Sequence, residues 1–299
     1  MAKAVFTTKV DPTYDDLPEL RYHFPKTYLR QVEAAVGDWI VYYEPRRSTG
    51  HLSSRGGRRA YFATARVRSV APDPQLPDHY YAHIADFIEF DRPVPFASSE
   101  HYFESKLQRD DGKTNKGAFG RSVRIVPDDE FELIVQAGFV RLLGDERVPE
   151  AEWTGQLAEE PAIFERPVVE RMVARPFRDR AFAVSVKKAY DNTCAVTGLK
   201  LINGGGRSEV QAAHIRPVAD MGPDSIRNGV ALSSTMHWMF DRGLMSLDDD
   251  FSILLAKDKV PEPVVRMINP ERRLILPDRP EFRPHPQFLR YHRETVFKG

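Results

Sequence analysis

The sequence contains almost no cysteine, no long apolar run and no net charge. Its single cysteine, Cys194, excludes an internal disulfide and any zinc site built from several cysteines. No apolar run approaches the roughly 20 residues that a transmembrane helix needs. The first residues also lack the apolar core of a signal peptide. We therefore expect a cytoplasmic protein.

The balanced charge hides an uneven distribution along the chain. Residues 1–160 contain 21 Lys and Arg against 26 Asp and Glu, whereas residues 161–299 contain 22 against 17. An excess of basic residues favours contact with nucleic acid in the second half. The excess is small, so we expect phosphate binding to depend on local clusters rather than on a global field.

Residues 209–250 carry the most informative pattern in the chain. Apolar periodicity predicts a strand at 211–215, a second at 229–233 and a helix at 235–244. The polar residues of interest lie within this ββα pattern and are His214, Asn228, His237 and Asp241. His237 and Asp241 are four residues apart and share a helical face. Such a unit suits phosphodiester hydrolysis, in which one divalent ion stabilises charge on the phosphate and a neutral histidine accepts a proton from water.

The segments CAVTG, AAHIRP, NGVALS and HWMFDRGL match the HNH (ββα-metal) nucleases in order and spacing. The chain resembles that family over about residues 175–256. The resemblance implies that His214 is the general base and that Asn228 supports the loop and orients the base. It further implies that His237 is a catalytic metal ligand and that Asp241 is a second ligand. A divalent ion, Mg²⁺ or Mn²⁺, and double-stranded DNA follow as expected cofactor and substrate.

One position departs from the wider family. Ala213 precedes the expected base, where an Asp or His ligand is common. An ion held by His237 and Asp241 alone would keep several waters, which magnesium tolerates better than zinc. A further carboxylate, Glu209 or Asp220, is an alternative ligand, and the sequence does not choose between them. Three arginines flank the motif and are candidates for phosphate contacts: Arg216, Arg227 and Arg242. Arg242 is alternatively a helix C-terminal cap.

The order of segments predicts two domains. The acidic, proline-containing stretch at 146–170 has no clear periodicity and is typical of a linker. It separates a domain at 1–145 from a nuclease domain at 171–299. We expect an amphipathic helix at 177–190, ahead of the CAVTG segment, and a short helix at the end of the proline-rich tail.

The first 140 residues are rich in predicted strands. Runs at 37–45, 58–72, 79–96 and 122–138 alternate with Gly- or Pro-containing connections and end in a helix, which favours a small barrel. The pattern resembles the PUA-like superfamily over roughly residues 5–140, with EVE-like members closest and SRA domains as alternatives. The expected fold class is therefore α+β, with a PUA-like β-barrel followed by a ββα-metal nuclease domain. Domains of this superfamily commonly hold a modified nucleobase flipped out of the duplex.

A base pocket needs aromatic faces for stacking and polar groups for the base edge. The candidates in the front domain are Tyr14, Asp15, Tyr22, Phe24, Trp39 and Tyr43. An aspartate can accept a hydrogen bond from the cytosine amino group. The alternative is that the strand aromatics only fill the core, as alternate residues must in any barrel.

The two resemblances together imply a modification-dependent, type IV-like restriction endonuclease. Its front domain would read 5-methyl- or 5-hydroxymethylcytosine, and its HNH domain would cut the DNA nearby. Because one HNH site cuts one strand, we expect a homodimer. Two alternatives stay open: a nuclease whose front domain binds nucleic acid without reading a modification, and a non-catalytic reader with a decayed nuclease half.

Overall fold

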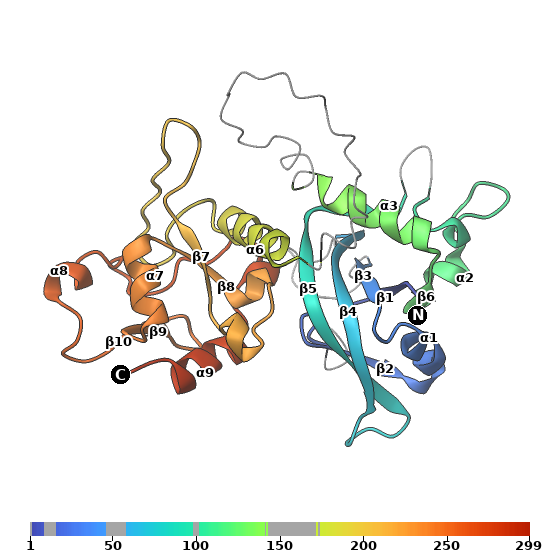
Figure 1. The fold of residues 1–299 in the computed structure, drawn as a ribbon, viewed down its shortest axis with the longest axis horizontal. Helices are drawn as coiled ribbons and strands as arrows, with labels where there is room; N and C mark the ends of the chain where they lie inside the picture. Colours follow the sequence, from blue (N-terminus) through green and yellow to red (C-terminus); the bar gives the residue numbers. More distant parts are fainter. Residues whose placement is uncertain are drawn as a thin grey trace, which may run out of the picture. The chain divides into compact units, whose positions relative to one another are not determined.

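The computed structural model describes residues 2–8, 16–45, 58–97, 102–140, 142, 172 and 174–299. The chain divides into two compact units, Met1–Arg178 and Asp179–Gly299, and each is described by itself (Figure 1). The expected linker at 146–170 lies outside the described residues, so the domain bounds inferred from sequence stay a prediction. Within the described ranges, no helix is both long enough and apolar enough to span a membrane.

A six-stranded sheet forms the centre of unit 1. Its order is β2-β5-β4-β3-β1-β6, with β1 parallel to β3 and the other neighbours antiparallel. The strands are β1 (Ala4–Thr7), β2 (Arg21–Pro25), β3 (Trp39–Glu44), β4 (Ala60–Pro72), β5 (His79–Pro95) and β6 (Val123–Ile125). Its helical elements are η1 (Lys26–Tyr28), α1 (Leu29–Ala34), η2 (Ser105–Leu107), α2 (Lys116–Phe119) and α3 (Asp128–Gly138).

The sheet is strongly curled (Figure 1). Its longest strands, β4 and β5, shift register three times along their pairing, and each such irregularity bends and twists a ladder. The α+β class expected from sequence is therefore correct. In the described strand order β2 and β6 are the two edges, so a closed PUA-like barrel is not established by these strands.

The central strand β3 is buried along its whole length. One cluster of buried apolar side chains includes Ile40 and Tyr42 of β3 together with Val32 of α1. Helix α3 lies along the sheet and buries Phe131 and Ile134. Because both faces of β3 are buried, residues 39–43 form a continuous apolar run rather than an alternation of apolar and polar residues.

Unit 2 contains the ββα arrangement expected from sequence. Strands β7 (Gln211–His214) and β8 (Gly229–Leu232) pair antiparallel, and helix α7 (Ser234–Asp241) follows directly. The helix that leads in is α6 (Arg175–Ala189), which begins at the end of unit 1. The remaining elements are η3 (Val218–Asp220), η4 (Ile226–Asn228), β9 (Met245–Leu247), β10 (Ile253–Leu255), α8 (Glu262–Val265), η5 (Pro280–Phe282) and α9 (Pro286–Thr295).

Helix α7 ends three residues earlier than the periodicity predicts. Gly243, two residues beyond it, has a φ of +71°, and a Cβ there would lie 2.0 Å from the carbonyl oxygen of Val296. Only glycine allows this close approach of the C-terminal segment. The apolar pattern continues past the helix because Leu244 and Met245 enter the next strand region.

A buried histidine joins the C-terminal helix to α7. His292 of α9 donates through Nε2 to the carbonyl oxygen of Phe240, 3.2 Å away, and its Nδ1 accepts from the Ser246 hydroxyl at 2.8 Å. Its ring stacks on the Phe240 ring at a centroid distance of 3.8 Å. Burial lowers the pKa of His292 to about 4, so the imidazole is neutral at physiological pH.

Candidate functional site

The expected base, His214, is the last residue of β7 and pairs with Gly229 of β8. Its Nε2 lies 2.9 Å from Oδ1 of Asp224, and its ring stacks on that of Phe182 from α6, with centroids 3.7 Å apart. A carboxylate only accepts hydrogen bonds, so Nε2 carries the proton and Nδ1 is the basic nitrogen of the neutral ring. Asp224 thus holds the Nε2 edge of the imidazole and Phe182 covers one face of the ring. The side chain is 19% exposed.

Asp224 is a site residue that the sequence did not identify. It lies on the loop between β7 and β8, ten residues after the histidine it contacts, and its side chain is only 5% exposed. In sequence it follows Gly222 and Pro223, and aspartate is common in such turns for local reasons. No periodic pattern distinguishes a turn-forming aspartate from one that reaches back to a strand.

Asn228 holds the two ends of that loop together. Its Oδ1 accepts from the backbone N–H of Arg216 at 2.8 Å. Its Nδ2 donates to the carbonyl oxygens of Arg216 at 3.0 Å and of Pro223 at 2.9 Å. The side chain is fully buried. Pro223, whose carbonyl oxygen it binds, directly precedes Asp224. Asn228 therefore fixes the loop on which the His214–Asp224 contact depends.

The loop is also closed by a backbone contact that needs glycine. A Cβ at Gly222 would lie 1.9 Å from the carbonyl oxygen of Arg216. Since no real side chain tolerates this distance, any larger residue at 222 would displace the backbone next to Pro223 and Asp224.

The two expected metal ligands lie next to each other on α7. His237 Nε2 is 3.4 Å from Oδ2 of Asp241, and the two side chains are 23% and 56% exposed. His237 Nδ1 lies 2.7 Å from Oε1 of Gln211 on β7. An amide oxygen only accepts, so Nδ1 carries the proton and the Nε2 lone pair faces the carboxylate. A ligand histidine is commonly oriented in this way by a hydrogen bond at its other nitrogen.

The resemblance to HNH nucleases implies a divalent ion. The donor atoms of this site fit an ion that is held by few protein ligands. One imidazole nitrogen and one carboxylate converge at an accessible place, which suits an ion that keeps several waters. Among the described residues, no group of three or more His, Cys, Asp and Glu side chains is gathered for a metal. Ala213, the position of the missing ligand, is fully buried opposite Val230.

The two alternative carboxylates have other partners. Glu209 Oε1 accepts from the backbone N–H of Ser234 at 2.9 Å and from its hydroxyl at 3.1 Å, at the first residue of α7. Asp220 bonds to the hydroxyl of Tyr291 on α9. Each carboxylate thus has a structural contact in the described part of the chain.

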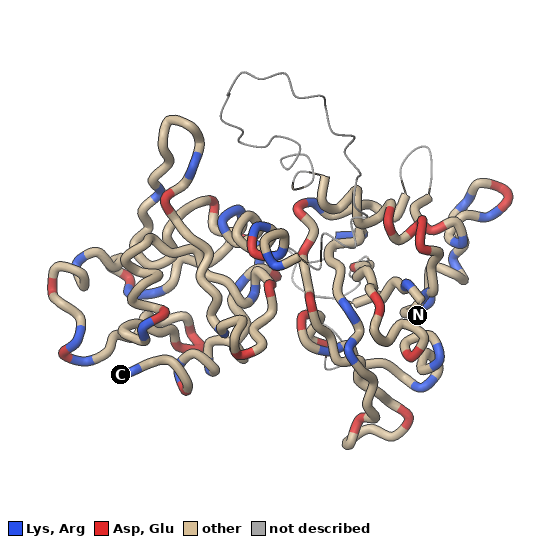
Figure 2. Tube along the Cα trace, viewed as in Figure 1, with Lys and Arg blue, Asp and Glu red and all other residues tan. Residues whose placement is uncertain are grey.

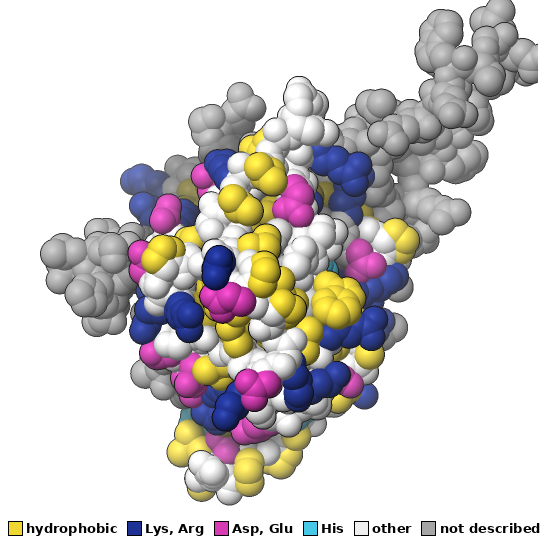
Figure 3. Space-filling model, turned by 90° about the vertical axis from the view of Figure 1, so that its left-hand side faces the viewer, with side chains coloured by type: hydrophobic (Ala, Val, Ile, Leu, Met, Phe, Trp, Pro, Cys, Tyr) yellow, Lys and Arg dark blue, Asp and Glu magenta, His cyan; other side chains and the backbone are white. Residues whose placement is uncertain are grey.

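The three candidate arginines differ in their surroundings. Arg216 donates from Nε to the carbonyl oxygen of Asp220 at 2.8 Å, and its guanidinium lies over the ring of Tyr291. Arg227 is half-buried, whereas Arg242 is exposed at the C-terminal end of α7. On the face of the molecule turned to the viewer in Figure 3, basic side chains are interspersed with acidic ones rather than gathered in one patch.

The described candidates for the modified-base pocket are all core residues. Tyr22, Phe24, Trp39 and Tyr43 are between 1% and 4% exposed. Tyr22 packs on Phe24 with ring centroids 6.1 Å apart, and burial raises the pKa of Tyr43 to about 12. The other two candidates, Tyr14 and Asp15, lie outside the described residues.

Comparison with known proteins identifies the nuclease half. Residues 194–248 match the HNH endonuclease family model, and this match includes all four site residues expected from sequence. No curated protein matches the chain. The chain therefore carries an HNH endonuclease domain.

Three solved structures show partial similarity. A modification-dependent TagI restriction endonuclease is 15% identical, with 98% of this chain and 81% of that chain covered, at a TM-score of 0.32. The N-terminal domain of Staphylothermus marinus McrB is 10% identical, covering 44% and 92%, at 0.30. The type IV phosphorothioation-dependent restriction endonuclease ScoMcrA is 13% identical, covering 79% and 52%, at 0.20. TM-scores this low do not establish a shared fold.

Proposed function

We propose that this chain, whose residues 194–248 form an HNH endonuclease domain, is a modification-dependent DNA endonuclease. Its nuclease domain hydrolyses phosphodiester bonds, and its front unit reads 5-methyl- or 5-hydroxymethylcytosine. The observation that carries the catalytic half is the juxtaposition of Asp224 with His214, at 2.9 Å. This contact fixes the tautomer of His214 and places a carboxylate beside the positive charge that the ring gains on protonation.

In the proposed reaction His214 is the general base. Nδ1 accepts a proton from water, whose oxygen attacks phosphorus while the bond to the leaving ester oxygen breaks. The imidazolium that forms is stabilised by the Asp224 carboxylate at Nε2, and stacking on Phe182 keeps the ring from turning. Asn228 acts indirectly, by holding the loop that presents Asp224.

His237 and Asp241 are the proposed ligands of the divalent ion, Mg²⁺ or Mn²⁺. When bound, the ion supplies charge stabilisation at the scissile phosphate and the leaving oxygen. Gln211 holds the His237 ring through Nδ1, so that Nε2 stays available as a donor. Arg216, Arg227 and Arg242 are proposed phosphate contacts, and the exposed position of Arg242 supports this role most directly.

The front unit is the proposed reader, with a PUA-like architecture of the EVE or SRA type. Support comes from its curled, aromatic-rich sheet and from the acidic balance of residues 1–160. A unit with a net negative charge gains little affinity from overall phosphate attraction, so specific binding needs a pocket. Trp39 and Tyr43 would form the packed wall behind such a pocket, since both are buried. Tyr14 and Asp15 stay candidates for direct contact with the base.

We also propose a homodimer as the active form on DNA. One HNH site has one general base and one divalent ion, which is sufficient for one strand. A double-strand break therefore needs two sites or two successive events. Sedimentation of the protein with and without duplex DNA distinguishes a dimer from a monomer that nicks twice.

The catalytic half is tested by nicking of supercoiled plasmid DNA carrying modified cytosine, with Mg²⁺ or Mn²⁺ and with EDTA. We expect nicking that requires the ion and disappears in His214→Ala. Absence of nicking with either ion would favour the alternative of a non-catalytic reader. Equal nicking of modified and unmodified plasmid would favour a nuclease with a general nucleic-acid-binding front domain.

A further inference from the structure

A basic segment lies in the otherwise acidic front unit. Between residues 105 and 121 the sequence has five Lys and Arg residues against two acidic ones, Asp110 and Asp111. The loop before α2 carries both blue and red stretches in Figure 2. Arg109, Lys113 and Lys116 are all exposed in the structure. Arg109 lies 3.6 Å from Asp111, but both side chains are largely exposed, and such a pair is weak in water.

These three cations line one open cleft of about 850 Å³. Tyr102, Thr114 and Asn115 complete its polar lining. The Tyr102 and Thr114 hydroxyls lie 2.8 Å apart, which ties the two sides of the cleft together. Asn115 Oδ1 accepts from the backbone N–H of Ala118, so the amide presents its donor side elsewhere. The lining thus combines positive charge with hydroxyl and amide groups.

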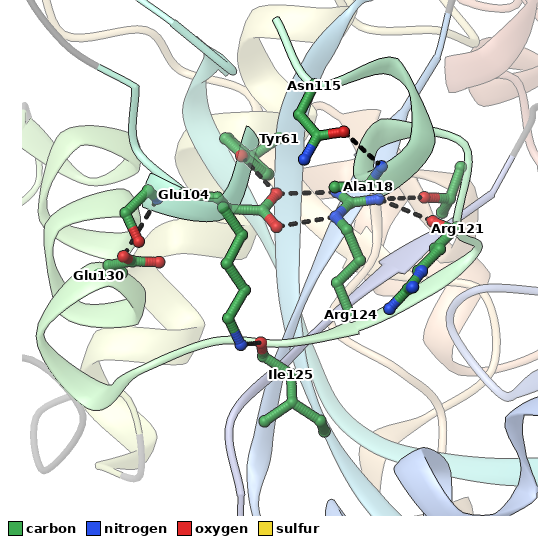
Figure 4. Close-up of polar contacts among 11 residues, drawn as sticks. Tyr61, Glu104, Asn115, Ala118, Arg121, Arg124, Ile125 and Glu130 are labelled. Carbon is green, nitrogen blue, oxygen red and sulfur yellow. Dashed lines mark hydrogen bonds and ion pairs between the residues drawn. The ribbon is translucent and has the colours of Figure 1, made fainter. Parts of the chain in front are cut away.

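The cleft stands on a rigid, buried base (Figure 4). The Glu104 carboxylate receives two hydrogen bonds from the Arg124 guanidinium, at 2.7 and 2.8 Å, and one from the Tyr61 hydroxyl at 2.7 Å. Arg124 also donates to the carbonyl oxygen of Arg121 at 2.9 Å. All three network side chains are at most 7% exposed. Since Glu104 and Arg121 flank the basic segment, its two ends are fixed to the sheet.

Exposed cations beside hydroxyl and amide groups in an open cleft are the features that contact a sugar-phosphate backbone. We infer that this cleft binds the phosphate backbone of the duplex that the front unit reads, with Arg109, Lys113 and Lys116 as the contacting cations. The identity of the polymer rests on the proposed function. Such contacts position the duplex and carry no sequence or modification information.

The test compares two triple variants of the full-length protein that remove the same charge. One is Arg109→Ala/Lys113→Ala/Lys116→Ala. The control is Lys26→Ala/Arg30→Ala/Arg68→Ala, three exposed cations elsewhere in the same unit. Fluorescence anisotropy measures the affinity for a labelled duplex at several salt concentrations, with modified and unmodified cytosine. Circular dichroism and thermal melting check that both variants fold.

Each lost phosphate contact reduces the slope of log Kobs against log salt by about 0.9. We expect the cleft triple to reduce the slope by about two to three, and the control triple to leave it nearly unchanged. A single Lys113→Glu variant should reduce it by about one or more. An unchanged slope in the cleft variants, or an equal reduction in the control, would overturn the inference.

The same data separate this inference from the proposed function. The ratio of affinities for modified and unmodified duplex tests the reader, and the loss of salt dependence tests the cleft. We expect the cleft triple to keep the wild-type ratio, because phosphate contacts are blind to the base. Suppose that the wild-type protein binds modified and unmodified duplex equally well, and that the cleft triple variant has a reduced salt slope. This result would reject modification reading and support the cleft.

Discussion

Replacement of Asp224 by Asn tests the catalytic geometry most sharply, because it keeps the shape of the side chain and removes its charge. The His214 Nε2–H would still find an acceptor oxygen, but the imidazolium formed on proton transfer would lose its counter-charge. A hydrogen bond to a charged group contributes about 1.5–3 kcal/mol and a neutral one about 0.5–1.5 kcal/mol. The difference of about 1.5 kcal/mol corresponds to roughly tenfold in rate.

We therefore expect Asp224→Asn to cleave about 10-fold more slowly than wild type in single-turnover reactions at saturating DNA. The affinity for DNA should not change, because Asp224 is buried and acts through His214. Asp224→Ala should be slower than Asp224→Asn, since it also removes the acceptor oxygen. Quenched-flow cleavage of an end-labelled duplex gives the rate, and anisotropy gives the affinity.

The matched control is Asp249→Asn. Asp249 accepts from Arg293 at 2.7 Å and is another paired aspartate of unit 2, without a contact to His214. It should cleave at the wild-type rate. If Asp224→Asn also cleaves at the wild-type rate while His214→Ala is inactive, then Asp224 does not support the base and the tautomer argument is wrong.

Three further predictions follow from the same structure. His214→Ala should lower single-turnover cleavage by more than about 100-fold with folding intact, and a smaller loss would remove its assignment as base. His237→Ala should weaken both Mn²⁺ binding, measured by calorimetry, and cleavage, with Asp241→Asn weaker in effect; unchanged Mn²⁺ affinity in both would exclude this ligand pair. His292 should contribute acid sensitivity, because burial lowers its pKa in the folded protein to about 4, below the ordinary value of 6.5. Its contribution to stability is complete above about pH 6.5 and falls by up to about 3 kcal/mol as pH drops toward 4. Urea unfolding of wild type and His292→Gln at several pH values measures this, and equal pH dependence of the two would contradict it.

The sequence was sufficient for the ββα unit because its information is local. The spacing of His237 and Asp241 on one helical turn, and the apolar strands before them, are set by backbone periodicity alone. The bounds shifted where a tertiary contact intervened, as at Gly243, which must accommodate the carbonyl oxygen of Val296. The helix α6 and the terminal helix α9 were predicted for the same local reason.

The partners of the site residues were not predictable in the same way. Asp224 contacts His214, which lies ten positions earlier in the chain. Gln211 contacts His237, which lies twenty-six positions later. Such contacts depend on how the loop folds, which here is decided by the buried amide of Asn228. The resemblance gave Asn228 its supporting role, but the carboxylate that it helps to place appears only in three dimensions.

The front unit shows the complementary limit of sequence patterns. In a sequence, aromatic residues on strands are equally compatible with a base pocket and with a hydrophobic core. In the structure Tyr22, Phe24, Trp39 and Tyr43 are buried in the core. The basic cleft was missed because its cations are spread over a loop, interrupted by Asp110 and Asp111, and cancel in a count over the whole unit.

Modification dependence is the central claim, and single-turnover cleavage of matched duplexes tests it most directly. The substrates share one sequence and carry cytosine, 5-methylcytosine or 5-hydroxymethylcytosine, with Mg²⁺ present and His214→Ala as the blank. One well-made set of base contacts discriminates by about 1–3 kcal/mol, or roughly 5-fold to 150-fold. We predict that at least one modified duplex is cleaved faster than the unmodified one by such a factor. Equal cleavage of all three duplexes would contradict the account.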